Sequence, residues 1–270
     1  RKEALKEDIF LLPGVELSVN DGANGIHTLV VFGDEWLTDR NDYINQFLNV
    51  AFEGKTPSEY ENENSRCTLG LINTIQKLEG YHKDFFLIFA HVEDRSGLWN
   101  ELDGGRMQEL GENEFFCRRC LGFQKVRTHD LSTRKCRVKV KNWLGNAYPA
   151  EVEGSDPKRI EEIGKGEQLF LKIGAFTFEA VKLCLLEKDR LMTAKVPGPK
   201  HSRLQSIHFQ GGILDGKTIS FSLGLNCLIG IRGSGKSAIL ESIRYALDLQ
   251  FGEKTIDRPY MEELTEFALG

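Results

Sequence analysis

The chain has 270 residues, of which 40% are hydrophobic, 28% charged and 10% aromatic, a composition typical of a folded globular protein. At about 100–200 residues per domain, this length predicts two domains. The net charge of −5 excludes a uniformly basic surface but permits a local basic patch. No apolar run approaches the roughly 18 residues of a membrane span, and no signal peptide is recognisable. Six cysteines are too few for a disulfide scaffold, so we expect a cytoplasmic protein without membrane association.

Strand-like and helix-like segments alternate through residues 1–194. Apolar, β-rich runs predict strands at 9–19, 26–32, 84–91, 137–143 and 150–153. Apolar residues at helical spacing predict helices at 68–79, 160–165 and 178–189. The continuous apolar run at 84–91 is typical of a parallel strand covered on both faces. This order predicts an α/β domain.

A composition change divides the chain near its last third. Two prolines and a glycine lie within residues 194–201, as is typical of a linker. We therefore predict a first domain at 1–194, a linker at 195–203 and a second domain at 204–270. In the second domain we expect strands at 204–209, 218–221 and 225–229, and a helix at 238–249. The chain begins with arginine rather than methionine, and we expect it to be an excerpt of a longer protein.

The most specific motif is Gly230-x-x-x-x-Gly235-Lys236-Ser237, the phosphate-binding P-loop or Walker A pattern. Its glycines permit φ > 0, so that successive N–H groups can face a phosphate, and the following helix adds positive potential. Lys236 is expected to reach the β- and γ-phosphates and Ser237 to ligate Mg²⁺. The predicted nucleotide-binding residues are Gly230, Arg232, Gly233, Ser234, Gly235, Lys236, Ser237 and Ala238.

The residues around this loop resemble the SMC/RecF/ABC-type ATPases. The resemblance is carried by Ile207-x-Phe209, Ile219-x-Phe221, Asn226 ahead of Gly230, and residues 240–247. It implies ATP with Mg²⁺, ATP-dependent pairing of two heads in the full-length protein, and nucleic acid as the mechanical target. Arg232 stands where this family often has asparagine. The family's later acidic residue, signature loop and coiled coil do not fit in residues 250–270, so we expect ATP binding without independent hydrolysis.

In the first domain, polar residues next to apolar strands are the informative ones. Glu16 lies within a strand, His91 follows a strand, and Asp156 follows another strand after a Gly-Ser pair. In barrel-like α/β folds, residues at the carboxyl ends of strands converge on one face. Glutamate, histidine and aspartate are ligands for zinc, manganese or iron. Each residue also suits a structural role, as an edge glutamate, a hydrogen-bonded histidine or a helix N-cap.

This order of segments resembles the PHP family (polymerase and histidinol phosphatase), a distorted (β/α) barrel that binds metals for phosphoester hydrolysis. The resemblance is carried by residues 12–18, 26–29, 89–91 and 154–156. It implies that Glu16 bridges metals and that His91 and Asp156 are ligands, while His27 is either a ligand or a strand-edge histidine. The family's opening His-x-His strand is absent, and Lys158 replaces a usual histidine. Because a protonated lysine cannot bind a metal, we expect a poor phosphoesterase.

A PHP-like barrel followed by the N-terminal part of an SMC-like ATPase head is similar to bacterial PHP-domain-associated ATPases of the TrlF type. This resemblance extends over essentially the whole chain. It implies an ATP-binding protein that acts in nucleic-acid metabolism, repair or defence. Two alternatives stay open: a metal-dependent phosphoesterase or nuclease that nucleotide regulates, and a degenerate PHP scaffold without catalysis.

A Cys-x-x-Cys pattern within the first domain is compatible with a zinc knuckle. Cys117 and Cys120 are followed by His129 and Cys136, and a zinc site can be drawn through these four residues. The spacing fits no strong zinc template. Ordinary structural thiols explain the same residues.

The segment 117–142 is strongly basic. It holds nine lysines and arginines against one acid, Asp130, in a chain of net charge −5. We interpret it as a contact surface for a nucleic-acid backbone, or alternatively as a solvated face or a partner of the acidic loop at 53–66. A strand at 137–143 would align Arg137, Lys139 and Lys141 along one face.

Overall fold

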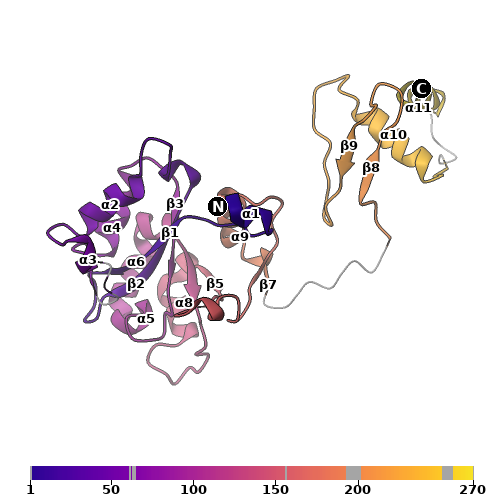
Figure 1. The fold of residues 1–270 in the computed structure, drawn as a ribbon. Coiled ribbons are helices and arrows are strands. Elements are labelled where there is room, and N and C mark those ends of the chain that lie inside the picture. The colour runs from indigo at the N-terminus through magenta and orange to yellow at the C-terminus, as the bar shows by residue number, and fades with distance from the viewer. Residues whose placement is uncertain are drawn as a thin grey trace. The chain divides into compact units, whose positions relative to one another are not determined.

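The computed structural model describes residues 2–60, 62, 65–155, 157–192, 202–250 and 258–269. The chain divides into two compact units, Arg1–Val196 and Pro197–Gly270 (Figure 1). The predicted linker at 195–203 lies almost entirely outside the described residues.

A mixed sheet of five strands forms the centre of the first unit (Figure 1). In spatial order its strands are β1 (Gly14–Val19), β2 (Ile26–Phe32), β3 (Phe85–Phe89), β4 (Cys120–Gln124) and β5 (Ala150–Val152). β2 pairs antiparallel with β1 and β3, whereas β3, β4 and β5 pair in parallel. The class is α/β, as predicted. The described strands form an open sheet with β1 and β5 at its edges, and do not close the predicted distorted barrel.

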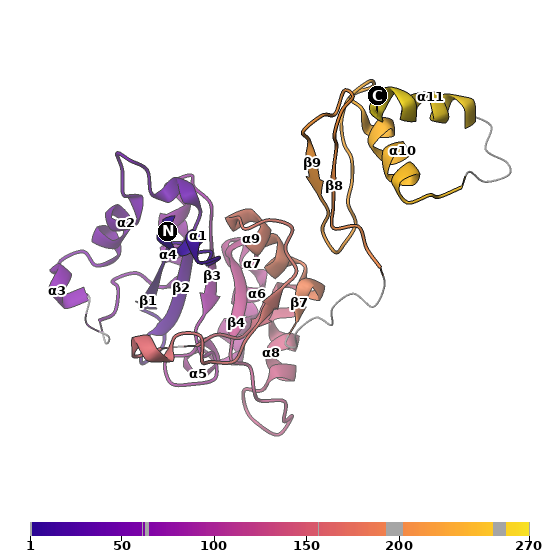
Figure 2. The ribbon, with the colours of Figure 1, turned by 45° about the vertical axis from the view of Figure 1, so that its right-hand side comes forward.

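Side chains of the sheet alternate between two apolar cores. In β3, Phe85, Leu87 and Phe89 belong to the larger core, and Phe86 belongs to the smaller one. The helices around the larger core are α2 (Tyr43–Ala51), α4 (Leu71–Glu79), α5 (Leu98–Glu101), α6 (Gly104–Glu112), α7 (Glu114–Arg119) and α8 (Arg137–Leu144). Helix α9 (Phe178–Leu186) covers the smaller core (Figure 2). There the ring of Phe178 stacks on Phe86 with centroids 5.2 Å apart.

Shorter elements complete the first unit. They are α1 (Lys2–Lys6), α3 (Pro57–Tyr60), the 3₁₀ turns η1 (Asp34–Trp36), η2 (Gly145–Ala147), η3 (Ile160–Glu162) and η4 (Lys188–Arg190), and the paired strands β6 (Phe170–Leu171) and β7 (Leu191–Met192). Within the described ranges, no helix is both long and apolar enough to cross a membrane. All six cysteines are described, and each is a free thiol.

Two predicted elements of the first unit were wrong. The segment 137–143, predicted as a strand, lies in helix α8. Cys136, Val140 and Leu144 are four residues apart and all buried, so the helical period outweighs the alternation of basic residues and valines. The helix predicted at 160–165 is only the 3₁₀ turn η3, since Ile160 and Ile163 are both exposed and give it no apolar face to bury.

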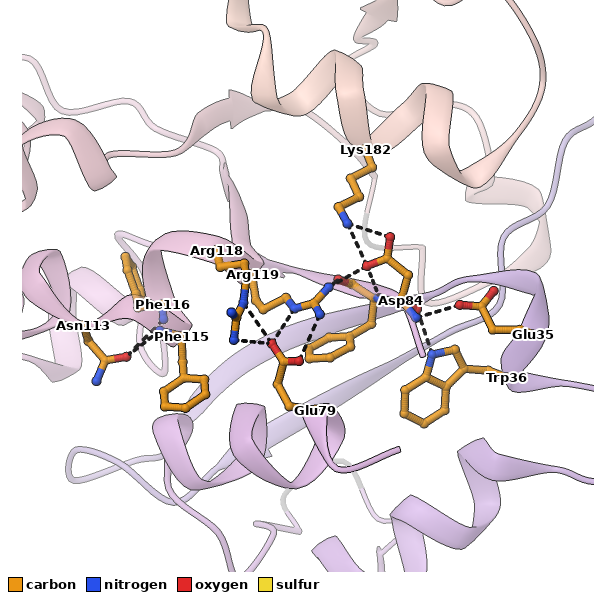
Figure 3. A network of polar contacts seen from close by, with 11 residues as sticks. Glu35, Trp36, Glu79, Asp84, Asn113, Phe115, Phe116, Arg118, Arg119 and Lys182 are labelled. Carbon is orange, nitrogen blue, oxygen red and sulfur yellow. Dashed lines mark hydrogen bonds and ion pairs between the residues drawn. The ribbon is translucent and has the colours of Figure 1, made fainter. Parts of the chain in front are cut away.

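An ion-pair network joins the amino end of β3 to three helices (Figure 3). Arg119 of α7 donates to Glu79 of α4 at 2.8 Å and to Asp84, the residue before β3, at 2.5 Å. Lys182 of α9 donates to the same Asp84 carboxylate at 2.6 and 2.7 Å. Arg118, which is more exposed, pairs with Glu79 at 2.8 Å. These contacts fix the helices on both faces of the sheet to one end of its central strand.

The second unit contains a hairpin and two helices. Strands β8 (Ser206–His208) and β9 (Thr218–Ser220) pair antiparallel, and helix α10 (Lys236–Ala246) packs against α11 (Arg258–Leu269) (Figure 2). The strand predicted at 225–229 does not form: Leu225 and Ile229 are 90% and 92% exposed. A central strand needs neighbours that accept and donate its backbone hydrogen bonds. The described residues of this unit supply none beside that segment.

Candidate functional site

The P-loop leads directly into α10. Gly235, the N-cap of α10, has φ of 84°, and Gly233 has φ of 82°. Glycine adopts this left-handed conformation without the steric cost that a Cβ imposes. A Cβ on Gly230 would lie 2.5 Å from Ser234 Oγ, so the two ends of the loop approach closely. The loop therefore curls over the helix N-terminus, whose amides give a positive potential that favours phosphate.

The ammonium group of Lys236 lies inside this loop. Its Nζ donates to the carbonyl oxygens of Gly230 and Ile231 at 2.8 and 2.7 Å, and lies 3.2 Å from Ser234 Oγ. These acceptors are neutral. Phosphate oxygens form stronger, charge-assisted hydrogen bonds with an ammonium group. Lys236 is thus held where an entering phosphate would exchange weak partners for strong ones.

The other predicted P-loop residues lie beside this lysine. Ser237 is exposed in the first turn of α10, Ala238 is buried beneath it, and Arg232 is exposed in the loop. Asn226 orders the approach to the loop: its Oδ1 accepts from the Ser222 N–H at 2.8 Å, and its Nδ2 donates back to the Ser222 carbonyl at 3.1 Å. The side chain of Asn226 therefore substitutes for a backbone turn.

In the first unit, the structure brings Glu16, His27 and His91 together. Glu16 lies in β1, His27 near the start of β2, and His91 just after β3. His27 pairs with Ser18 of β1, so Glu16 is its diagonal neighbour on the same face of the sheet. Because β2 runs antiparallel to β1 and β3, its beginning lies at the edge where β3 ends. One ligand atom from each of the three side chains lies within 4.8 Å of the others.

The contacts within this cluster are those expected of ligands that surround a cation. His27 Nδ1 lies 3.2 Å from Glu16 Oε1 and 3.2 Å from His91 Nε2. A ring nitrogen carries either one proton or one lone pair, so a single proton cannot give both contacts a full hydrogen bond. Ligand atoms about 2.1 Å from a tetrahedral ion lie about 3.4 Å apart. One carboxylate and two imidazoles therefore fit a zinc, manganese or iron ion.

The backbone around His91 is strained and is held by a side chain that sequence reasoning missed. His91 has φ of 30°, which is rare for a residue with a Cβ. Its N–H donates at 3.1 Å to Oε1 of Gln124, the last residue of β4, which is almost fully buried. His91 Nδ1 is also buried, with no hydrogen-bond partner among the described residues. The sequence did contain a signal for Gln124: like His91, it is a polar residue that directly follows an apolar run.

The cluster opens into a cavity of about 530 Å³. Lys158 lines this cavity together with the three candidate ligands, and so does Arg95, which follows His91 in the next turn. Arg95 was also missed from the sequence, because its place depends on the turn that follows β3. The predicted ligand Asp156 lies outside the described residues. The cavity lining thus combines the three candidate ligands with two cations, Arg95 and Lys158, and one further carboxylate, Asp94.

The alternative zinc knuckle was wrong. Within the described residues, the grouping of three or more potential ligands is Glu16, His27 and His91, and not the set that begins at Cys117. The thiol of Cys117 donates to the Gly111 carbonyl, and Cys120 is buried in β4. Burial raises the pKa of the Cys120 thiol, which opposes the thiolate that zinc requires. These residues act as ordinary thiols.

The basic segment 117–142 is largely compensated by acidic neighbours. Arg118 and Arg119 pair with Glu79, Arg127 with Glu153 and Glu167, and Arg137 and Lys141 with Glu151. Lys135 and Lys139 donate to backbone carbonyls. Because the segment 137–143 is helical, Lys139 does not share a face with Arg137 and Lys141 as an alternating strand would require. The predicted single row of cations is wrong.

One comparison with known proteins matched part of the second unit. Residues 206–265 match the family model described as an AAA domain. This range includes the β8–β9 hairpin, the P-loop and α10. The match indicates an ATPase-type region that binds ATP with Mg²⁺. Neither the comparison with curated proteins nor that with solved structures gave a match.

Proposed function

We propose that this chain joins an SMC/RecF-type ATPase head to a PHP-like, metal-dependent phosphoesterase site, and that the two act together on nucleic acid. The convergence of Glu16, His27 and His91 within 4.8 Å carries the phosphoesterase part. The AAA-domain match and the P-loop geometry support the ATPase part. ATP-dependent pairing of two heads in a longer protein belongs to the same proposal.

At the nucleotide site, the described residues supply positive potential for the phosphates. The amides of the loop and of the α10 N-terminus surround the phosphates, while Lys236 neutralises the charge on the β- and γ-oxygens. Ser237 is exposed in the first turn of the helix, where its hydroxyl would hold the Mg²⁺ that accompanies ATP. The outcome is tight binding of the triphosphate, which the rest of an ATPase head would use.

At the metal site, Glu16, His27 and His91 would hold the ion. The bound ion would supply a Lewis acid and a water of lowered pKa. Gln124 positions His91 through its backbone N–H, and so fixes the imidazole relative to the other two ligands. Arg95 and Lys158 supply positive charge toward the oxygens of a phosphoester that enters the cavity. A phosphodiester of nucleic acid is the substrate class that agrees with this charge and with the family resemblance.

The lysine in the cavity also supports the degenerate-scaffold alternative. Lys158 lines the space that the three candidate ligands share, and an ammonium near a metal lowers the affinity for that metal. In that case the fold is retained for docking or sensing. A nucleotide-regulated phosphoesterase is the remaining alternative, in which ATP acts only as an effector.

A gain-of-function substitution separates these readings. We expect Lys158→His to increase metal affinity and the metal-dependent cleavage of bis-p-nitrophenyl phosphate, because it exchanges a cation for a ligand. Lys165→His, at an exposed position that does not line the cavity, is the matched control. Cleavage that is lost in His91→Ala and raised in Lys158→His supports the phosphoesterase. Weak metal binding by the folded wild-type chain, with no cleavage by the wild type or by Lys158→His, supports the scaffold instead.

A further inference from the structure

A second cavity lies at the opposite edge of the same sheet. Its volume is about 520 Å³, and it lies beside Tyr148 and Pro149, which precede β5. β3 and β5 run in the same direction, since each pairs in parallel with β4. The start of β5 is therefore remote from His91, which follows the end of β3. This cavity is separate from the candidate metal site and the proposed function does not use it.

Cations dominate the lining of this second cavity. Arg137 and Lys141 lie one turn apart on α8, and Lys188 comes from η4. Among the described residues, the lining contains one carboxylate, Glu151, against these three cations. One oxygen of Glu151, Oε1, lies 2.6 Å from Arg137 Nε, 2.8 Å from Tyr148 OH and 3.7 Å from Lys141 Nζ. The cavity is left with an excess of positive charge.

The two lysines crowd around one aromatic ring. Lys141 Nζ lies 5.0 Å and Lys188 Nζ 5.9 Å from the centre of the buried Tyr148 ring. Lys188 also donates to the Tyr148 carbonyl, which uses one of the three N–H donors of its ammonium. Burial lowers the pKa of Lys188, and the positive charge of Lys141 lowers it further because the two ammonium groups repel each other. An anion between them would remove this repulsion.

Part of the cavity lining is apolar. Leu169 and Leu191 line it together with Pro149. Its volume lies within the range of about 300–1,000 Å³ that is typical of small-molecule sites. We propose that this cavity binds an organic phosphate monoester, with the phosphate held by Arg137, Lys141 and Lys188 and the organic part against the leucines. A phosphate dianion balances the excess charge, and an arginine fork suits its oxygens.

The test is a titration of the full chain that carries Lys236→Ala and is kept in a metal chelator, so that neither the P-loop nor a bound metal takes up phosphate. Inorganic phosphate, AMP and adenosine are compared by isothermal titration calorimetry. We expect AMP to bind more tightly than inorganic phosphate and adenosine not to bind. Adenosine that binds as tightly as AMP would overturn the proposal, and so would an absence of heat with both phosphates. Binding of inorganic phosphate alone would refute the organic part.

Substitutions that remove a positive charge and a substitution that removes a negative charge should change AMP binding in opposite directions, and so locate the site. Lys141→Gln and Lys188→Gln should each weaken AMP binding about tenfold, because each removes a charge-assisted contact. Glu151→Gln should strengthen AMP binding, because it removes the carboxylate that competes for the same cations. Lys139→Gln, on α8 but outside the lining, is the charge-matched control and should have no effect. Equal affinity in Lys141→Gln and Lys139→Gln would contradict the proposal, as would weaker binding in Glu151→Gln.

Discussion

His27 is the residue that connects the candidate metal site. Its Nδ1 contacts both Glu16 Oε1 and His91 Nε2 at 3.2 Å, so it belongs to both halves of the cluster. From the sequence, His27 could be either a ligand or a strand-edge histidine, because its position near the start of β2 does not by itself place it beside Glu16 and His91. The antiparallel direction of β2 places it there, because the start of β2 lies at the carboxyl edge of β1 and β3. The side chain is about one quarter exposed, so a ligand can reach the cluster from the cavity.

The first prediction concerns the side chain of Gln124. Gln124→Leu should weaken metal affinity by about tenfold, because the His91 N–H loses its acceptor and the imidazole loses its fixed orientation. The dissociation constant for Mn²⁺ or Zn²⁺, measured by competition with a chelating dye, gives the result. Gln124→Glu keeps an acceptor at this position and should restore most of the affinity. If Gln124→Leu binds metal as wild type does, Gln124 has no positioning role.

Lys236 provides a second prediction. Lys236→Ala should weaken ATP binding by at least about tenfold, since the loss of a charge-assisted contact costs about 1.5–3 kcal/mol. Fluorescence titration with a labelled ATP measures this change. Lys217→Ala, which removes an exposed lysine of the same unit from outside the loop, is the control and should bind ATP as wild type does. Equal affinity in the two variants would refute the assignment of the loop as a phosphate site.

At the scale of elements, long apolar runs were predictable and short ones beside charges were not. The strand within 84–91 and the helix within 68–79 follow directly from apolar run length and spacing. Helix α8 was missed because its alternating valines and basic residues imitate a strand, while the four-residue spacing of Cys136, Val140 and Leu144 determines the structure. Strand β4 was not predicted, because its few apolar residues follow two arginines directly. The sheet partners of β4 stabilise it, and a single sequence does not reveal them.

The ion-pair network at the start of β3 shows how elements are fixed to one another (Figure 3). The hydrogen bond from Arg119 lowers the pKa of Glu79 below its ordinary value of 4.5. For Asp84, burial alone would raise the pKa, but Lys182 and Arg119 outweigh it and hold the pKa below 3.8. A carboxylate whose pKa is lower in the folded state than in the unfolded state stabilises the fold at pH values above its unfolded pKa. This contribution decreases as the pH falls below about 4.5.

The third prediction concerns Arg119, whose side chain is 12% exposed and joins α4, α7 and β3. Arg119→Gln should lower the free energy of unfolding by about 2 kcal/mol at pH 7, because two carboxylates lose their closest partner. The loss of stability between pH 5 and 3 should also become shallower. Arg118→Gln removes an exposed ion pair with the same Glu79 and should cost less than about 1 kcal/mol. Urea unfolding at several pH values tests both variants. An equal decrease in the free energy of unfolding in Arg119→Gln and Arg118→Gln would contradict the role given to Arg119 in the network.

For the whole molecule, the division into two units gives each candidate site its own scaffold. The P-loop belongs to Pro197–Gly270, while the three candidate ligands belong to Arg1–Val196. The P-loop was readable because its residues are contiguous, so a local pattern defines it. The ligands are separated by up to 75 positions in the sequence, from Glu16 to His91, and the direction and register of three strands determine whether they meet. Arg95 and Gln124 were missed for the same reason.

The fourth prediction concerns the thermal unfolding of the two units. Mg²⁺-ATP should raise the unfolding temperature of a transition that belongs to the second unit, and Mn²⁺ or Zn²⁺ should raise that of a different transition. A ligand at one hundred times its dissociation constant stabilises its unit by about 2.7 kcal/mol. Differential scanning calorimetry of the full chain resolves the two effects, and Lys236→Ala should abolish only the first. A single transition that both ligands shift equally would contradict independent units.

Glu16, His27 and His91 are proposed to hold one metal ion, and the metal content of the full chain shows whether they do. After incubation with Mn²⁺ or Zn²⁺ and removal of the excess by gel filtration, inductively coupled plasma mass spectrometry counts the bound ions. We predict about one ion per wild-type chain, its loss in His27→Ala, and its retention in His129→Ala, whose histidine lies outside the cluster. A wild-type chain without metal, or a His27→Ala chain that retains the wild-type content, would contradict the account.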